Sequence, residues 1–142
     1  MKVKPKDGNK TFCMAPWSHT YLSPQSERRM CCASREKADW ATQYLDSEDA
    51  DKESVYNPGT LKDHWNSEYM KGIRKDLMAG KEIPQCQVCN DKLLNVSIYR
   101  DYFNKTLFPN KIDEAFEKTR DDGFTEMKPI SFDYRIKNLC NF

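Results

Sequence analysis

The sequence predicts an α+β fold, in which a small cysteine-rich metal-binding domain contains a β-hairpin and several helices and is followed by a further strand. Three observations support this prediction: a period-two apolar pattern on either side of a turn, apolar residues at helical spacing, and six cysteines that include a C-x-x-C pair. The 142 residues are enough for one domain. With 38% hydrophobic and 32% charged residues, we expect a small core that a bound metal helps to hold together.

A β-hairpin is expected between residues 18 and 33, with a turn at 24–27. Its alternating residues are Thr20, Leu22, Met30 and Cys32. Because antiparallel strands lie about 5 Å apart, the hairpin would bring Cys13 at its entry near the Cys31-Cys32 pair at its exit. Neighbouring cysteines in a strand point to opposite faces, so only one of the pair should face a shared centre.

Helices are predicted on both sides of the C-x-x-C pair. Thr60 and Ser67 can each cap a helix, and the second helix carries apolar residues at helical spacing before it stops at Gly80. Further helices are predicted over 93–108 and 112–120, followed by a strand at 129–136. Four basic residues are expected to form a solvated helix surface rather than a nucleic-acid patch: Lys71, Arg74, Lys75 and Lys81.

The C-x-x-C pair, Cys86 and Cys89, is the strongest functional signal in the chain. Two thiolates separated by two residues can hold one metal centre, and Pro84 just before them favours a tight connection between helices. The two missing ligands must come from the remaining cysteines, which are Cys13, Cys31, Cys32 and Cys140. Four thiolates suit a zinc ion or a [4Fe–4S] cluster equally well, but zinc ribbons have two such pairs. The spacing therefore favours an iron-sulfur cluster over structural zinc.

Other interpretations of the cysteines and histidines stay open. The cysteines can be free structural thiols, or disulfides in a secreted protein, although the basic start of the chain lacks the apolar run of a signal peptide. His19 or His64 can replace a thiolate as ligand, but a lone histidine is more often a hydrogen-bonded surface or core residue. We therefore expect metal-bound cysteines in a cytoplasmic protein.

The charge and hydropathy of the chain exclude two classes of partner. The formal net charge is +1, which provides no overall field to attract nucleic acid or an anionic membrane. No apolar stretch approaches the length needed to span a membrane. We therefore expect neither a nucleic-acid partner nor a membrane partner.

Several segments together resemble the auxiliary-cluster region, of SPASM or twitch type, of radical SAM proteins. The resemblance covers roughly residues 12–104 and rests on the following features: Phe12-Cys-Met-Ala-Pro-Trp-Ser-His19, the Cys31-Cys32 pair, Gly59 to Ser67 with Trp65, the Met70 to Gly80 helix, and Cys86-x-x-Cys89. The stretch from Phe132 to Phe142 resembles the first barrel strand of a radical SAM core and the beginning of its C-x-x-x-C-x-x-C loop, of which Cys140 is the first cysteine.

This resemblance implies a ligand set and a second cofactor. In the family the first cysteine of a Cys-Cys pair is generally the ligand, so Cys31 is preferred over Cys32, and Cys13, Cys86 and Cys89 complete the ligation of an auxiliary [4Fe–4S] cluster. Cys140 would bind the second, catalytic [4Fe–4S] cluster, which works with S-adenosylmethionine in a full-length parent protein. Only the first of the three loop cysteines is present, so we expect this chain alone to be inactive.

The resemblance also implies a domain organisation and a role. Residues 1–11 are an N-terminal tail, 12–104 the iron-sulfur domain, 105–126 a helical linker and 127–142 the start of a truncated (β/α) barrel. The chain would be the N-terminal portion of a radical SAM enzyme, and its auxiliary cluster would position a substrate or relay electrons. Its expected partners are a peptide or small-molecule substrate and the remainder of the barrel.

A competing hypothesis comes from a different functional class. The chain can be a zinc-stabilised interaction module that holds a protein partner through exposed aromatic residues. The aromatic residues that could do so follow the C-x-x-C pair and are Tyr99, Tyr102 and Phe103.

Overall fold

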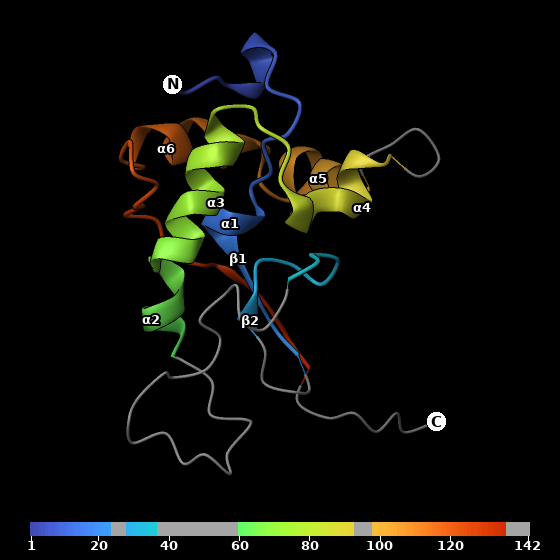
Figure 1. Cartoon of the computed structure of the whole chain (residues 1–142), viewed down its shortest axis with the longest axis vertical. Helices are drawn as coiled ribbons and strands as arrows, with labels where there is room; N and C mark the ends of the chain where they lie inside the picture. The colour runs from blue at the N-terminus through green and yellow to red at the C-terminus, as the bar shows by residue number, and fades with distance from the viewer. Residues whose placement is uncertain (24–27, 37–59, 93–97, 136–142) are drawn as a thin grey trace.

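The computed structural model describes residues 1–23, 28–36, 60–92 and 98–135. They form a mixed α+β structure with a three-stranded sheet in the order β2-β1-β3. In Figure 1, α3 lies to one side of α1 and β1, and α4 and α5 lie to the other. The predicted turn at 24–27 and the C-terminal residues 136–142, which include Cys140, lie outside the described residues.

The predicted hairpin is present in the sheet, but its second strand is shorter than expected, because residues 30–33 form a bend and a turn. Strand β1 (His19–Leu22) pairs antiparallel with β2 (Arg28–Arg29), and Tyr21 lies opposite Arg29. The helical turn α1 (Ala15–Ser18), with Pro16 in its first turn, leads directly into β1. The chain that follows Cys13 is therefore turned into the hairpin within a few residues.

The predicted C-terminal strand is β3 (Ser131–Tyr134), and it pairs with β1 in parallel. Thr20 lies opposite Phe132 in this register. The period-two pattern predicted the strand correctly but contained no information on its neighbour, because parallel pairing joins segments that are far apart in the sequence. The N-terminal hairpin and the end of the described chain thus share one sheet.

Side-chain caps start the two helices that precede the C-x-x-C pair, as predicted. The Thr60 hydroxyl accepts from Asp63 N–H at 3.1 Å and starts α2 (Leu61–Trp65), and the Ser67 hydroxyl accepts from Met70 N–H at 3.2 Å and starts α3 (Glu68–Met78). The buried face of α3 consists of apolar residues at helical spacing, together with one cation: Met70, Ile73, Arg74, Leu77 and Met78. Gly80, with φ of 79°, follows the helix end.

Short helical segments make up much of the remaining structure. The 3-10 turn η1 (Pro5–Asp7) lies near the N-terminus, and η2 (Pro84–Cys86) leads into α4 (Gln87–Asn90). The predicted helix before Pro109 begins within residues 93–97, which lie outside the described residues. Its described part consists of α5 (Ile98–Asp101) and a π-helical segment, η4 (Tyr102–Leu107). The predicted helix at 112–120 is α6 (Ile112–Glu117), which follows η5 (Pro109–Lys111). No described helix has the length and apolar character required to span a membrane.

The core contains aromatic and sulfur-bearing side chains from both ends of the chain. Phe12 packs against Trp17 and against Phe116 of α6, with ring centroids 4.9 Å apart in each pair. The indole of Trp17 is fully buried, and its Nε1–H donates to Thr119 Oγ1 at 2.8 Å. The residues around Cys13 are therefore anchored in the centre of the core.

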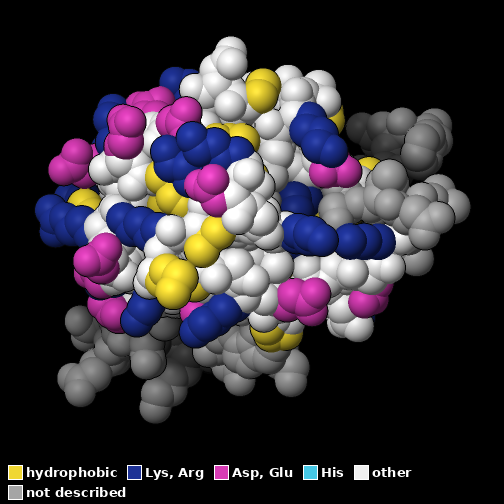
Figure 2. All heavy atoms as spheres, turned by 90° about the horizontal axis from the view of Figure 1, so that it is seen from above, with side chains coloured by type: hydrophobic (Ala, Val, Ile, Leu, Met, Phe, Trp, Pro, Cys, Tyr) yellow, Lys and Arg dark blue, Asp and Glu magenta, His cyan; other side chains and the backbone are white. Residues whose placement is uncertain are grey.

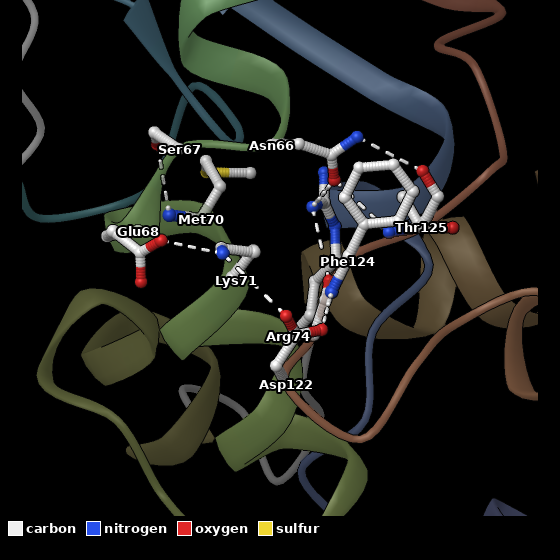
Figure 3. A network of polar contacts seen from close by, with 10 residues as sticks. Asn66, Ser67, Glu68, Met70, Lys71, Arg74, Asp122, Phe124 and Thr125 are labelled. Carbon is white, nitrogen blue, oxygen red and sulfur yellow. Dashed lines mark hydrogen bonds and ion pairs between the residues drawn. The ribbon is translucent and has the colours of Figure 1, made fainter.

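Arg74 is buried in this core, which corrects the prediction that it belongs to a solvated basic surface. Its side chain is 0% exposed, and Nε donates to Pro16 O at 2.8 Å. Figure 3 shows the guanidinium among the residues that follow α2 and those of the 122–125 turn. Nη2 donates to Trp65 O at 2.6 Å and Nη1 to Asn66 Oδ1 at 3.0 Å. Burial lowers the pKa of Arg74 to about 9, so it remains a cation at neutral pH.

The surface that Figure 2 shows carries charges of both signs. Basic and acidic side chains alternate across this face, with hydrophobic side chains between them. Ion pairs between exposed residues are frequent, for example Lys4 with Asp113 at 3.0 Å and Lys118 with Glu114 at 2.9 Å. Such pairs contribute little to stability, about 0–1 kcal/mol each.

Candidate metal centre

Four of the six cysteines line one cavity. Its lining includes Cys13, Cys31, Cys86 and Cys89, and the cavity volume is about 20 Å³. All four are buried, and none of the five described cysteines forms a disulfide. The cysteines come from three segments that are widely separated in the sequence, so the fold brings together the set that the resemblance implies.

Local structure explains how each segment presents its cysteine. Pro84 starts η2, and Cys86 ends it and becomes the N-cap of α4, so Cys89 follows within a single helical turn. Residues separated by three positions share one face of a helix. Cys31 follows β2, and the hairpin returns it towards Cys13, which precedes α1.

Cys32 lies outside this set. It is half-buried and is absent from the lining of the cavity. Its pKa is raised first by burial and then by the negative charge of Asp133 in β3. Cys31 therefore lines the cavity and Cys32 does not, but the two lie in a bend and a turn after β2 and not in the strand that the sequence predicted.

Burial keeps the thiols of Cys13, Cys31 and Cys86 protonated. The pKa of Cys13 and that of Cys86 are each raised to about 12, and the pKa of Cys31 is raised well above its usual range, in every case chiefly by loss of hydration. Thiolates are the form that binds metals, so metal binding here must displace these protons. These three thiols are therefore buried and neutral, unlike the ionised thiol of an exposed nucleophile.

Two hydrogen-bond donors act on the sulfurs. The N–H of Ala15 donates to Cys13 Sγ at 3.5 Å. The Arg100 side chain forms a hydrogen bond with Cys86 and lowers the pKa of that thiol, although burial dominates. Sequence reasoning did not identify Arg100. The available signal was a cation between two aromatic residues, Tyr99 and Tyr102, in a stretch that was expected to form a buried helix.

The two histidines lie elsewhere in the structure. His19 is on β1, where its Nδ1 forms a hydrogen bond with Ser131 Oγ at 2.9 Å. His64 is buried in α2, and burial lowers its pKa to about 4. Neither residue lines the cavity that the four cysteines share. The structure therefore does not place a histidine where it could replace one of the cysteine ligands.

The arrangement of the cysteines differs from that of a closed single-ion site. Over 1–23, 28–36, 60–92 and 98–135, no three His, Cys, Asp or Glu side chains are arranged so that they could hold a metal ion. A zinc ion needs four donors, each about 2.3 Å away when they are thiolates. The four cysteines instead surround the cavity, whose wall is completed by mainly apolar residues: Ala15, Met30, Ala33, Val88, Tyr99 and Phe103.

Phe103 belongs to this wall, so the prediction that it contacts a partner from an exposed position is wrong. Only 5% of its surface is exposed, and its ring packs 5.0 Å from that of His19 and 6.4 Å from that of Phe108. Tyr102, in contrast, is 50% exposed. The aromatic segment therefore has one residue in the core and another at the surface.

Comparison with known proteins does not add a relative from which a function could be transferred. No family model matches the chain, and searches of curated proteins and of solved structures found no match. A functional assignment therefore depends on the four cysteines and the residues around them.

Proposed function

We propose that Cys13, Cys31, Cys86 and Cys89 bind a [4Fe–4S] cluster. The observation that carries the proposal is that these four buried cysteines line one largely apolar cavity. Cysteine is the usual ligand of iron-sulfur clusters, and four thiolates complete the ligation of a cubane. The resemblance of residues 12–104 to auxiliary-cluster regions includes these same cysteines and supports the same proposal from the sequence.

The spacing of the cysteines along the sequence favours a cluster over zinc. Zinc ribbons have two C-x-x-C pairs, whereas this chain combines one such pair with the widely separated Cys13 and Cys31. Buried thiols around an apolar cavity also keep water away from a bound cluster, which influences its reduction potential.

With all four irons ligated, such a cluster transfers electrons or supports structure rather than binding a substrate directly. We propose that the chain is the N-terminal, auxiliary-cluster portion of a radical SAM protein, in which the cluster relays electrons or helps to position a peptide or small-molecule substrate. Of the cysteines of the radical SAM loop, the chain contains Cys140 alone.

The test is anaerobic reconstitution of the full chain with iron and sulfide, followed by metal and sulfide analysis. We expect about four irons and four sulfides per chain, the content of a [4Fe–4S] cluster, with the brown colour of such proteins. One zinc per chain in a colourless protein would contradict the proposal and favour the zinc-stabilised interaction module.

Cys31 and Cys32 provide a matched pair of variants for this test. Cys31→Ala removes a cysteine that lines the cavity, and Cys32→Ala removes a neighbour that does not. We expect Cys31→Ala to lose most of its iron and Cys32→Ala to retain it. Equal retention by both variants would show that Cys31 is not a ligand.

A specific observation keeps the interaction module as a second candidate. Tyr102, Ile98 and Leu107 expose 50%, 49% and 38% of their surfaces on neighbouring turns. Exposed apolar side chains that lie close together can form a contact surface for another protein. Metal analysis separates the two candidates, because this module needs only a structural ion.

A further inference from the structure

We propose that Arg100 is the fixed positive charge of the four-cysteine site and raises the reduction potential of the cluster bound there. This inference rests on the proposed iron-sulfur function and adds a residue that sets its redox property. Arg100 does not ligate the metal. It acts through Cys86, so it is a positioning and charge-compensating residue.

Contacts with the C-x-x-C segment hold the guanidinium in the wall of the cavity. Arg100 is 5% exposed and lines the cavity together with the four cysteines. Its Nη2 donates to Asn90 Oδ1 at 2.7 Å, and Asn90 Nδ2 donates in turn to Ile83 O at 3.3 Å. Asn90 directly follows Cys89, so these bonds link the cation to the segment that carries two of the ligands.

The helical segment that carries Arg100 also contacts the other side of the site. Asn104 Oδ1 accepts from Met14 N–H at 2.8 Å, and Asn104 Nδ2 donates to Phe12 O at 2.7 Å. These two backbone groups lie on either side of Cys13. One side chain therefore clamps the Cys13 segment, while Arg100, one turn earlier, contacts Cys86.

The shape of the segment suits this double contact. Arg100 is in α5 and Asn104 is in the π-helical segment η4, and Phe103 between them closes the wall of the cavity. A π-helical turn is rare and is frequently found at functional sites. Figure 1 shows α5 beside α4, the helix that holds Cys89. The position of the Arg100 charge is therefore fixed by the hydrogen bond to Asn90 on one side and by the contacts of Asn104 with the Cys13 segment on the other.

A buried positive charge at this position favours the reduced cluster. Four thiolates make a bound [4Fe–4S] centre negative overall, and reduction adds one further negative charge. A cation held nearby in a low-dielectric environment stabilises the more negative state. Removal of the charge should lower the ratio of reduced to oxidised cluster about tenfold at a given potential.

The experiment is a redox titration of the reconstituted full chain with dithionite as the one-electron reductant, followed by the visible absorption of the cluster. We expect Arg100→Gln to lower the midpoint by about 59 mV, the equivalent of a tenfold change for a one-electron couple. Arg100→Lys retains the charge, so its ratio of reduced to oxidised cluster at a given potential should stay within about twofold of that of the wild type. Lys105→Gln is the matched control, because it removes a cation from the same segment whose side chain is 76% exposed and screened by salt.

Each outcome has a defined meaning. A midpoint in Arg100→Gln that equals those of wild type and Lys105→Gln, at equal iron content, would overturn the inference. If Arg100→Gln does not retain a cluster, Arg100→Lys decides: retention with a near wild-type midpoint supports the role of the charge, and equal loss overturns it. Absence of iron and sulfide from the wild-type chain would refute the proposed function instead.

Discussion

The surroundings of Arg74 and the four-cysteine site both bury side chains that can carry a charge. They differ in whether the buried side chain is charged and hydrogen-bonded or neutral. We call Arg74 and its partners Pro16, Trp65 and Asn66 the Arg74 region. There the cation donates to neutral oxygens of the chain itself, and its guanidinium also lies 4.7 Å from the centroid of the Trp65 ring. At the cysteine site, burial raises the pKa of the Cys13, Cys31 and Cys86 thiols and leaves these thiols neutral.

This difference assigns two roles to two parts of one small chain: the Arg74 region stabilises the fold, and the proposed role of the cysteine site is to bind a ligand. Hydrogen bonds from a buried cation to fixed carbonyl groups stabilise the fold without any added ligand. Neutral thiols make only weak hydrogen bonds, so their burial contributes mainly as packing of small apolar groups. We therefore expect changes in the Arg74 region to affect the metal-free chain, and changes at the cysteines to affect chiefly the metal-loaded chain.

The largest effect is expected from Arg74→Met. The variant removes the cation and leaves the carbonyl oxygens of Pro16 and Trp65 buried without this donor, which should lower the free energy of unfolding by about 3–5 kcal/mol. Chemical denaturation of the metal-free chain, followed by circular dichroism, measures it. Lys75→Met is the control, because Lys75 is the exposed neighbour on the same helix. Similar small losses in both variants would remove the contrast between the two regions.

The turn at Gly123 tests how closely the chain packs against α3 beside the Arg74 region. A Cβ atom at this position would lie 1.9 Å from Lys71 O, and φ is +95°. Gly123→Ala should therefore destabilise the chain by about 2–3 kcal/mol. Gly72→Ala, in the open middle of α3, should stabilise it by about 0.5–1 kcal/mol. Equal effects of the two substitutions in thermal unfolding would contradict the close approach.

The smallest effect on the metal-free chain is expected from Cys86→Ala. The substitution removes one buried sulfur atom at the edge of a cavity, so the free energy of unfolding of the metal-free chain should change by about 1 kcal/mol or less. In the iron-loaded chain the variant should also lose the stabilisation that bound metal provides. Thermal unfolding with and without bound iron measures both. A large loss in the metal-free chain would mean that the cysteine site is a structural core instead.

Sequence reasoning predicted the features that depend on neighbours in the chain. Thr60 and Ser67 act as helix caps, because capping joins a side chain to a backbone N–H only three residues away. The period-two pattern predicted the hairpin but extended its second strand too far, because Cys31 and Cys32 lie in a bend and a turn after β2. The proximity of Cys13 to the C-x-x-C segment was expected only from the chemistry of metal ligation and from resemblance.

Features that depend on distant residues were missed or mistaken. Arg74 looked like a surface residue, because helical spacing does not reveal that the carbonyl of Pro16, 58 positions away, lies within reach. Phe103 looked like a contact residue, because an aromatic side chain at helical spacing can face either the core or solvent. The clamp of Asn104 on the backbone around Cys13 spans about 90 residues and has no signature in either segment.

The amino-acid sequence by itself determined the local elements of this protein: where helices begin, where the hairpin strands alternate, and which cysteines form a C-x-x-C pair. The tertiary structure alone decided that Arg74 is buried, that β3 lies beside β1, and that Arg100 joins the cysteine cavity. The physical reason is range. Caps, turns and alternation depend on atoms a few residues apart, whereas the environment of a buried charge depends on carbonyls, sulfurs and rings that only the complete fold brings together.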